Sequence, residues 1–331
     1  MPTTITNTIG ASGADYTTMA LWEDGTDNTS LVTADEVRVG ALMNEEFTAA
    51  SSFGTIGGAT TDATRYRELK CAAGASFRDN ASVQTNALRY NASNGAGLRM
   101  TAGFDTVLNT AENNVHLNGL QISSIADGAS LALYVQSGTG IVVENCILEG
   151  KNTNGAVLFN ATGVIRNCLI TQHVSGANLI SQIEFATADV VNCTFAVPSD
   201  LTAATDAVAA GSGTVAFKNC AFFGATDTTG SGTPTYTTCY GDDASPPTGV
   251  TTATYANQFQ NTAAATRDFR LKTGADCIDN GTTDTTNGPI DIAGTARPSG
   301  SAYDVGAWEF VAAGGGIVIP VLTRQYRARW T

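Results

Sequence analysis

The stretch Val143-Glu144-Asn145-Cys146-Ile147-Leu148 has a pattern that recurs three more times along the chain. The pattern is an apolar residue, a variable residue, Asn, Cys, a variable residue and an apolar residue. Its other copies are Ile165-Arg166-Asn167-Cys168-Leu169-Ile170, Val190-Val191-Asn192-Cys193-Thr194-Phe195 and Phe217-Lys218-Asn219-Cys220-Ala221-Phe222. The asparagines follow one another at intervals of 22, 25 and 27 residues. Such a period predicts a chain built from similar coils.

A degenerate copy before these four, Leu117-Asn118-Gly119-Leu120-Gln121-Ile122, has Gly119 at the Asn position, and a later one, Tyr236-Thr237-Thr238-Cys239, keeps only the Cys. Asn and Gly are the residues that most readily adopt positive φ, so this position predicts a sharp bend between two short strands. The Cys after the bend is expected to point inward. The predicted structural ladder comprises Asn145, Cys146, Asn167, Cys168, Asn192, Cys193, Asn219, Cys220 and Gly119.

A bend in every coil, with strands on both sides, indicates a parallel β-solenoid whose coils stack about 4.8 Å apart. A leucine-rich repeat needs a Leu-rich consensus, and a β-sandwich gives no reason for a recurring Asn-Cys pair. The predicted fold class is therefore all-β. Glu144 and Arg166, each just before an Asn, are expected to be exposed neighbours on adjacent coils, and such a pair contributes little stability.

The composition excludes several classes of protein. Charged residues make up 14% of the 331 residues, the net charge is −13, and the sequence contains no uninterrupted apolar stretch of about 18 residues. We therefore expect neither a membrane span nor a nucleic-acid partner. The N-terminus lacks the features of a secretory signal peptide, so folding in the cytoplasm is expected. The seven cysteines have no CxxC spacing and are interpreted as buried free thiols.

The sequence divides into three parts. Residues 1–35 are predicted to hold a capping helix within 13–24, with Thr17 or Thr18 as N-cap, and residues 36–310 to form the solenoid and its closing region. Residues 311–331 are a Gly-rich hinge and an arm that carries +3, so the rest of the chain carries −16. The arm is interpreted either as a disordered or folded-back end, or as a partner-binding segment through Arg324, Tyr326, Arg327, Arg329 and Trp330.

Several motifs lie outside the repeat: Gly13 to Trp22, Asp268-Phe269-Arg270-Leu271, residues 274–281, residues 291–294, Arg297-Pro298 and the closing element Tyr303-Asp304-Val305-Gly306-Ala307-Trp308-Glu309-Phe310. Together they resemble the right-handed parallel β-helix proteins of the pectate-lyase-like superfamily. The resemblance covers roughly residues 10–310. It implies a right-handed parallel β-helix with an N-terminal capping helix and an extended C-terminal tail. Because the superfamily includes lyases, hydrolases, phage tailspikes and inert virion parts, the resemblance implies no single activity.

Candidates for acid-base chemistry are sparse. His116 and His173 are interpreted as surface or loop residues, and the acidic doublets 35–36, 45–46 and 242–243 would point their two side chains to opposite faces of a strand. Asp291 and Asp304 match the closing motif and are interpreted as turn and cap residues. The sequence assigns no catalytic residue, no cofactor and no metal ligand, although carboxylates from different coils could still form a cluster.

The expected function is that of a phage virion structural protein, since a β-helix without an export signal and with a terminal arm suits a particle assembled in the host cytoplasm. We expect a homotrimeric capsid decoration, fibre or spike component whose arm docks on a capsid or tail protein. The trimer is an analogy with phage members of the superfamily. The alternative is a tailspike-like protein that binds or degrades a host polysaccharide. A surface adhesin is disfavoured by the unpaired cysteines.

Overall fold

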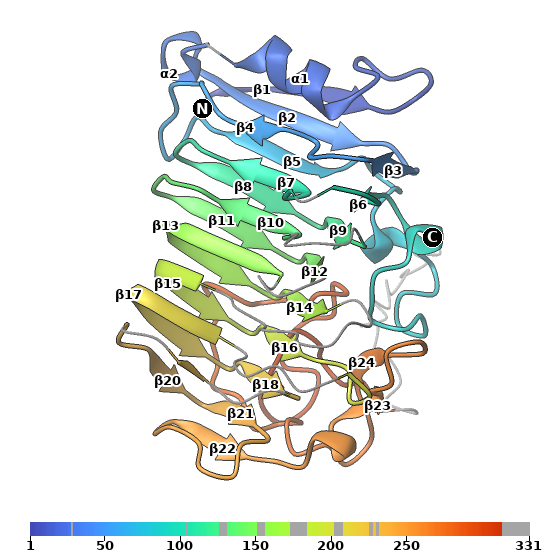
Figure 1. Cartoon of the computed structure of the whole chain (residues 1–331), viewed down its shortest axis with the longest axis vertical. Coiled ribbons are helices and arrows are strands. Elements are labelled where there is room, and N and C mark those ends of the chain that lie inside the picture. The colour runs from blue at the N-terminus through green and yellow to red at the C-terminus, as the bar shows by residue number, and fades with distance from the viewer. Residues whose placement is uncertain are drawn as a thin grey trace, which may run out of the picture.

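The computed structural model describes residues 1–27, 29–103, 105–125, 131–150, 156–172, 184–201, 208–224, 228–229 and 232–312. Within these residues the chain winds into a right-handed parallel β-helix, with its coils stacked along the long axis of the molecule (Figure 1). Strand pairing in the two large sheets is parallel throughout. The all-β class and the β-helix predicted from the sequence are confirmed.

The first large sheet has two strips. One joins β1, β2, β5, β8 and β11, and the other joins β4, β7 and β10; the strips meet at β13, which pairs with β10 through its first half and with β11 through its second. The strands of this sheet are β1 (Thr3–Ile9), β2 (Glu36–Leu42), β4 (Thr55–Ile56), β5 (Arg67–Cys71), β7 (Leu108–Thr110), β8 (Val115–Asn118), β10 (Leu133–Val135), β11 (Ile141–Glu144), β13 (Val157–Arg166), β15 (Glu184–Val191), β17 (Val208–Lys218), β19 (Thr228–Thr229) and β20 (Thr235–Thr237).

The second large sheet forms the other wall of the helix and supports the candidate site described below. Its strands are β3 (Glu46–Ala49), β6 (Gly97–Met100), β9 (Gln121–Ser124), β12 (Ile147–Gly150), β14 (Leu169–Gln172), β16 (Thr194–Ala196), β18 (Ala221–Phe223), β21 (Cys239–Gly241) and β22 (Val250–Thr252). A separate antiparallel pair, β23 (Phe259–Asn261) and β24 (Asp268–Leu271), lies in the closing region.

The interior of the β-helix is filled by stacked apolar columns. One column on the first sheet runs Leu69, Leu117, Val143, Ile165, Val190 and Phe217, each in register with the next and at most 1% exposed. On the second sheet, the rings of Phe195 and Phe222 stack with centroids 5.1 Å apart. Burying one such side chain contributes about 1.5–3 kcal/mol to the free energy of folding, so these columns supply a large part of the stability of the β-helix.

The N-terminal end is closed by α1 (Met19–Thr26), followed by α2 (Leu31–Ala34). The hydroxyl of Thr18 accepts a hydrogen bond from the Leu21 amide, and Met19 and Trp22 are buried against the core. Gly40 of β2 lies under the Trp22 ring, where a Cβ atom would come within 2.8 Å. The predicted capping helix is confirmed.

The closing region, residues 253–310, folds back over the outer face of the second sheet and builds a second apolar core there. Phe223, Phe259, Phe269 and Trp308 belong to this core, and so do Phe77 and Leu88 from residues 74–96. Three 3₁₀ turns (Phe77–Asp79, Ala92–Asn94 and Tyr255–Asn257) lie in these segments. The second sheet is therefore buried on both sides over much of its length.

The β-helix begins earlier than the sequence indicated. Strand β1 pairs with β2 over all of its seven residues, so the first sheet already starts within residues 1–35. Five of its seven residues are polar, and Thr3, Thr4 and Thr6 are exposed, so Ile5 and Ile9 alone gave only a weak apolar signal. None of the helices in the described parts of the chain is long and apolar enough to cross a membrane.

Candidate functional site

The structure places the residues of the predicted ladder at the bend between the two large sheets. Asn145, Asn167, Asn192 and Asn219 have φ between 51° and 57°, and Gly119 has φ 69°. Thr238 takes the same conformation at φ 54°, although a Thr rarely does. The side-chain amides of three of these asparagines reach the preceding coil: that of Asn145 donates to the Asn118 oxygen at 3.1 Å, that of Asn167 to the Asn145 oxygen at 3.4 Å, and that of Asn219 to the Asn192 oxygen at 3.0 Å. The Asn192 amide nitrogen has no hydrogen-bond partner among the described residues.

The cysteines of the ladder point into the core. Cys146, Cys168, Cys193 and Cys220 are fully buried, and their thiols donate to backbone carbonyl oxygens, as Cys220 Sγ does to Val190 O at 3.3 Å. Burial raises the pKa of each of these thiols well above its ordinary value. Their surroundings fit a packing role, since a reactive thiol needs an exposed, electropositive environment.

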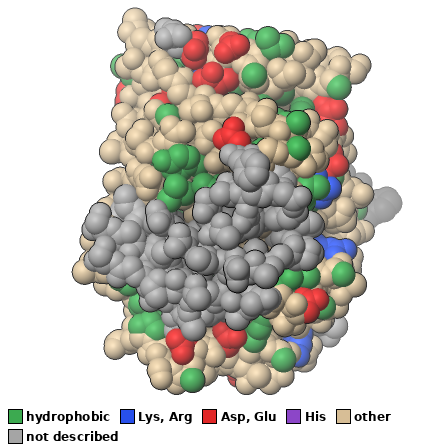
Figure 2. Space-filling model, in the orientation of Figure 1, with side chains coloured by type: hydrophobic (Ala, Val, Ile, Leu, Met, Phe, Trp, Pro, Cys, Tyr) green, Lys and Arg blue, Asp and Glu red, His purple; other side chains and the backbone are tan. Residues whose placement is uncertain are grey.

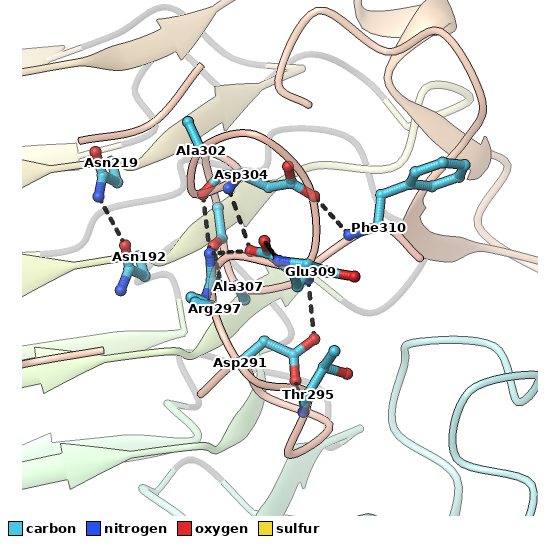
Figure 3. Close-up of polar contacts among 12 residues, drawn as sticks. Asn192, Asn219, Asp291, Thr295, Arg297, Ala302, Asp304, Ala307, Glu309 and Phe310 are labelled. Atoms are coloured by element: carbon cyan, nitrogen blue, oxygen red, sulfur yellow. Dashed lines mark hydrogen bonds and ion pairs between the residues drawn. The ribbon is translucent and has the colours of Figure 1, made fainter. Parts of the chain in front are cut away.

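The closing motif forms a buried polar knot around one guanidinium (Figure 3). Arg297 forms an ion pair with Glu309 (Nη1 to Oε2, 3.1 Å) and donates to the carbonyl oxygens of Asp304 and Gly306. The Asp291 carboxylate accepts from the amides of Ala293, Thr295 and Glu309, and the Asp304 carboxylate accepts from those of Asp279 and Phe310. Both aspartates thus hold the backbone turns of the closing motif together, as the sequence predicted. We assign the residues of this knot a structural role and no catalytic one.

The remaining sequence candidates are scattered. The His116 ring, on β8, stacks on Tyr66 with centroids 3.9 Å apart, and burial lowers its pKa. Glu144 and Arg166 form the partly exposed pair expected from the repeat, at 2.6 Å. His173 and all five predicted residues of the arm (Arg324, Tyr326, Arg327, Arg329 and Trp330) lie outside the described residues. No group of three or more His, Cys, Asp or Glu side chains in the described ranges is arranged to hold a metal ion.

A charged pocket of about 380 Å³ lies on the outer face of the second sheet. Its floor comes from β3, β6 and β12, and its walls are residues 89–93 and the segment 264–267 just before β24. We call it the Arg/Glu pocket; its charged and aromatic lining residues are Glu46, Arg89, Tyr90, Arg99, Glu149 and Arg267.

Register explains how two of the floor residues, Arg99 and Glu149, come to lie on the same face of the sheet, with Ser123 of β9 between them. Arg99, Ser123 and Glu149 occupy one outward-facing column on neighbouring strands. The hydroxyl of Ser123 donates to Glu149 Oε1 at 2.9 Å. The pocket therefore draws its polar floor from successive coils, although the coils supply different residue types.

The wall of residues 89–93 is held by two features of the sheet. The Gln121 side chain accepts from the Asn91 amide at 2.9 Å and donates to the carbonyls of Asn91, Gly95 and Ala96. Gly97 of β6 leaves room for the Tyr90 ring, since a Cβ atom there would lie 2.5 Å from the Tyr90 hydroxyl oxygen. Tyr90 consequently lies against the sheet with its hydroxyl beside Glu46.

Two clusters of charge line the pocket. Glu149 is 1% exposed and forms a buried ion pair with Arg267, which also donates to Ala264 O at 2.5 Å. Near the opening, the Tyr90 hydroxyl donates to Glu46 Oε1 at 3.0 Å, and the Arg99 guanidinium lies 4.6 Å from the Tyr90 ring centroid. Burial, followed by the charge of Glu46, raises the pKa of the Tyr90 hydroxyl. Tyr90 is therefore a neutral hydrogen-bond donor at neutral pH.

The pocket presents three guanidinium groups against two carboxylates in a chain whose net charge is −13. Arg267 is engaged with Glu149, and Arg99 forms an ion pair with Glu46 (Nε to Oε1, 3.2 Å). Arg89 and Arg99 are both partly exposed at the pocket. Their planar donors suit a carboxylate or neighbouring hydroxyls. The arrangement can bind an anionic, hydroxyl-rich group.

Sequence reasoning placed none of the floor residues in a site: Glu46 was considered only within the acidic doublet 45–46, and Arg99 and Glu149 were not considered. Glu149 lies four positions after Asn145, and the matching positions in the next three coils hold Thr171, Ala196 and Phe223. A single acidic residue in this otherwise uncharged column was therefore a signal that the sequence offered. Tyr90, Arg99 and Arg267 come from segments outside the repeat, and no spacing rule links them to it.

Comparisons with known proteins found no matching family model and no matching curated protein. Among solved structures, the chain is similar to the pectin methylesterase from Aspergillus niger in deglycosylated form, with 16% identity over 75% of this chain and 89% of that chain, and a TM-score of 0.45. It is also similar to pectate lyase Pel9A, with 10% identity over 93% and 97% of the two chains and a TM-score of 0.38. We infer no activity from these similarities. The assignment of the β-helix fold rests on the strand pairing described above.

Proposed function

We propose that the protein is a polysaccharide-binding β-helix, of the tailspike-like kind, whose Arg/Glu pocket takes an acidic sugar residue. The observation that carries the proposal is the group of guanidinium donors in a preformed hollow on an otherwise acidic molecule. A sugar carboxylate would pair with Arg99 or Arg89, and sugar hydroxyls would meet Glu46 and Tyr90. Charge-assisted hydrogen bonds of this kind contribute about 1.5–3 kcal/mol each.

Titration calorimetry with a uronic-acid oligosaccharide and a neutral oligosaccharide of equal length tests the proposal. We expect the acidic ligand to bind more tightly, and Arg99→Ala to weaken its binding at least about tenfold, the equivalent of 1.4 kcal/mol. The matched control is Arg166→Ala, which removes a partly exposed arginine from the first sheet. Equal binding of both ligands, or wild-type affinity in Arg99→Ala, would contradict the proposal.

Degradation of the glycan is tested in the same samples. Release of reducing or unsaturated sugar ends would make the protein a polysaccharide-degrading enzyme, with Glu46 the first carboxylate to substitute because it lies exposed at the opening of the pocket. Binding without release of such ends supports a binding protein.

A second proposal is the structural role in a phage particle expected from the sequence: a homotrimeric spike, fibre or capsid decoration, assembled in the host cytoplasm, that docks on a capsid or tail protein. What supports it is the contrast between the +3 arm and the −16 remainder of the chain. Deleting residues 312–331 should abolish binding to particles that lack the protein, while the β-rich circular dichroism spectrum stays unchanged. Undiminished particle binding by the deleted form would contradict this role.

A further inference from the structure

A second hollow, of about 400 Å³, lies at the N-terminal end of the second sheet. One wall is the start of α1, and the other is β3 with the residues that follow it. We call it the cap groove; its principal lining residues are Thr17, Met19, Glu45, Phe47, Thr48 and Phe53. The Phe47 and Phe53 rings pack against the core yet remain partly exposed in the groove, which gives it apolar walls.

The surroundings of the cap groove are acidic. Residues 1–36 contain six Asp and Glu residues and no Lys or Arg. Three of the six form ion pairs with arginines further along the chain (Glu23 with Arg67, Asp35 with Arg65, Glu36 with Arg38), which leaves Asp15, Asp24 and Asp27 without an ion pair among the described residues. Figure 2 shows acidic side chains gathered at the end of the visible face where α1 lies. At the groove itself, the Glu45 carboxylate accepts from the Ala11 amide at 2.6 Å, and no ion pair of the described residues engages it. A cationic, aromatic segment would match both the charge and the walls.

The C-terminal arm has this chemistry. Residues 313–331 contain three arginines, one tyrosine and one tryptophan, and no acidic residue. The described chain ends at Ala312, a few residues after Trp308, which lines a small hollow together with Gln121 of β9. Strands β9, β6 and β3 are successive neighbours, so the groove lies about 10 Å away along the sheet. Nineteen residues can span up to roughly 60 Å, which is ample.

We propose that the cap groove binds the Arg- and aromatic-rich end of this chain's own C-terminal arm, residues 323–331. An aromatic side chain of the arm fills the space between Met19, Phe47 and Phe53, and its arginines face Glu45 and the acidic N-terminal end. Because the arm is tethered, its effective concentration at the groove is in the millimolar range, so modest affinity suffices. Both proposed functions can fail and leave this inference intact, because docking within one chain needs neither a glycan nor a particle, although Glu46 lines both hollows.

Trypsin digestion of the intact protein, followed by mass spectrometry, tests the inference. Trypsin cuts after Arg324, Arg327 and Arg329, and docking slows these cuts. The variant Thr48→Arg places a bulky positive charge at an exposed position on the β3 wall of the groove, and Thr17→Lys does so on the opposite wall. We expect both variants to release the arm at least about tenfold faster than the wild type, and added salt to speed release from the wild type by screening its charges.

The matched control is Thr251→Arg, an exposed Thr in β22 at the other end of the same sheet, which should be cut at the wild-type rate. Unchanged thermal melting shows that each variant is folded. Equal cleavage rates in the wild type and both groove variants would overturn the inference. Protection that grows with protein concentration would assign the groove to a second copy's arm and overturn docking within one chain.

Discussion

Arg67 shows how much of the N-terminal cap rests on one side chain. It is fully buried; its Nε and Nη2 reach the two carboxylate oxygens of Glu112 at 2.7 and 2.6 Å, and its Nη1 reaches Glu23 of α1 at 3.1 Å. It also donates to the carbonyl oxygen of Gly57 and the hydroxyl of Thr26. One guanidinium thus links the capping helix, the loop after β4 and the loop after β7.

Replacing this arginine should destabilise the protein strongly. In Arg67→Met the buried Glu112 loses its cation, and such a change costs about 3–5 kcal/mol. Arg166→Met, which breaks the partly exposed pair with Glu144, should cost at most about 1 kcal/mol. Urea unfolding of the two variants measures both values. A loss below 1 kcal/mol in Arg67→Met would show that the cluster does not hold the cap.

The closing knot predicts a dependence of stability on pH. Burial raises the pKa of Glu309 from 4.5 to about 7, against the opposing effect of Arg297. An acid whose pKa is higher in the folded than in the unfolded state stabilises the fold fully below the unfolded value, and this contribution is lost as the pH rises through the folded value. The stability of the wild type relative to Glu309→Gln should therefore fall between pH 4.5 and about 7. Thermal melting across this range measures the difference, and a difference that rose with pH would contradict the account.

At the scale of the elements, the bend between the two large sheets is bonded to residues 282–288 of the closing region. The Asn219 amide donates to Thr282 O at 2.7 Å, its oxygen accepts from the Thr282 amide at 2.8 Å, and Lys218 forms an ion pair with Asp284. Val191 precedes Asn192 as Glu144 and Arg166 precede their asparagines, but it is only 3% exposed, in the part of the bend that the closing segment approaches. The chain of amide contacts is interrupted between Asn167 and Asn192, beside Gly288.

Gly288 is the position at which this contact is tightest. A Cβ atom there would lie 1.9 Å from the Asn192 side-chain nitrogen, so Gly288→Ala must displace the bend or the segment. We expect a loss of about 1–3 kcal/mol in unfolding free energy, as for other overpacked sites. Gly57→Ala, whose Cβ would meet only ordinary contacts at 3.8 Å, should change stability by less than about 1 kcal/mol. Equal effects of the two substitutions in denaturant unfolding would show that the segment does not pack as described.

The elements also show what the sequence could predict. The bends and inward cysteines were readable because the same residues recur in register. The N-cap was narrowed to Thr17 or Thr18, and the structure uses Thr18. Strand β1 was not readable, because its exposed side chains are Thr. The Arg/Glu pocket was not, because Tyr90 and Arg267 reach the Arg99 face of the sheet from two different segments, residues 74–96 and the folded-back closing region, and such contacts leave no periodic signal in the sequence.

At the scale of the molecule, the shortage of charge has a structural cause, and it sets the Arg/Glu pocket apart from the rest of the sheet. Both faces of the second sheet are covered over much of its length, outside by the closing region and residues 74–96, so few of its positions can carry charge. The Arg/Glu pocket lies where these two coverings leave a gap, between residues 89–93 and 264–267. A charged hollow at that place is the feature most readily explained by a ligand.

Hydrogen exchange with and without a saturating acidic oligosaccharide tests this central claim most directly. Ligand in the Arg/Glu pocket should slow exchange in residues 89–93 and 264–267, and leave β2 and β5 on the first sheet unchanged. No change at the pocket, or slowing confined to the first sheet, would contradict the proposed site.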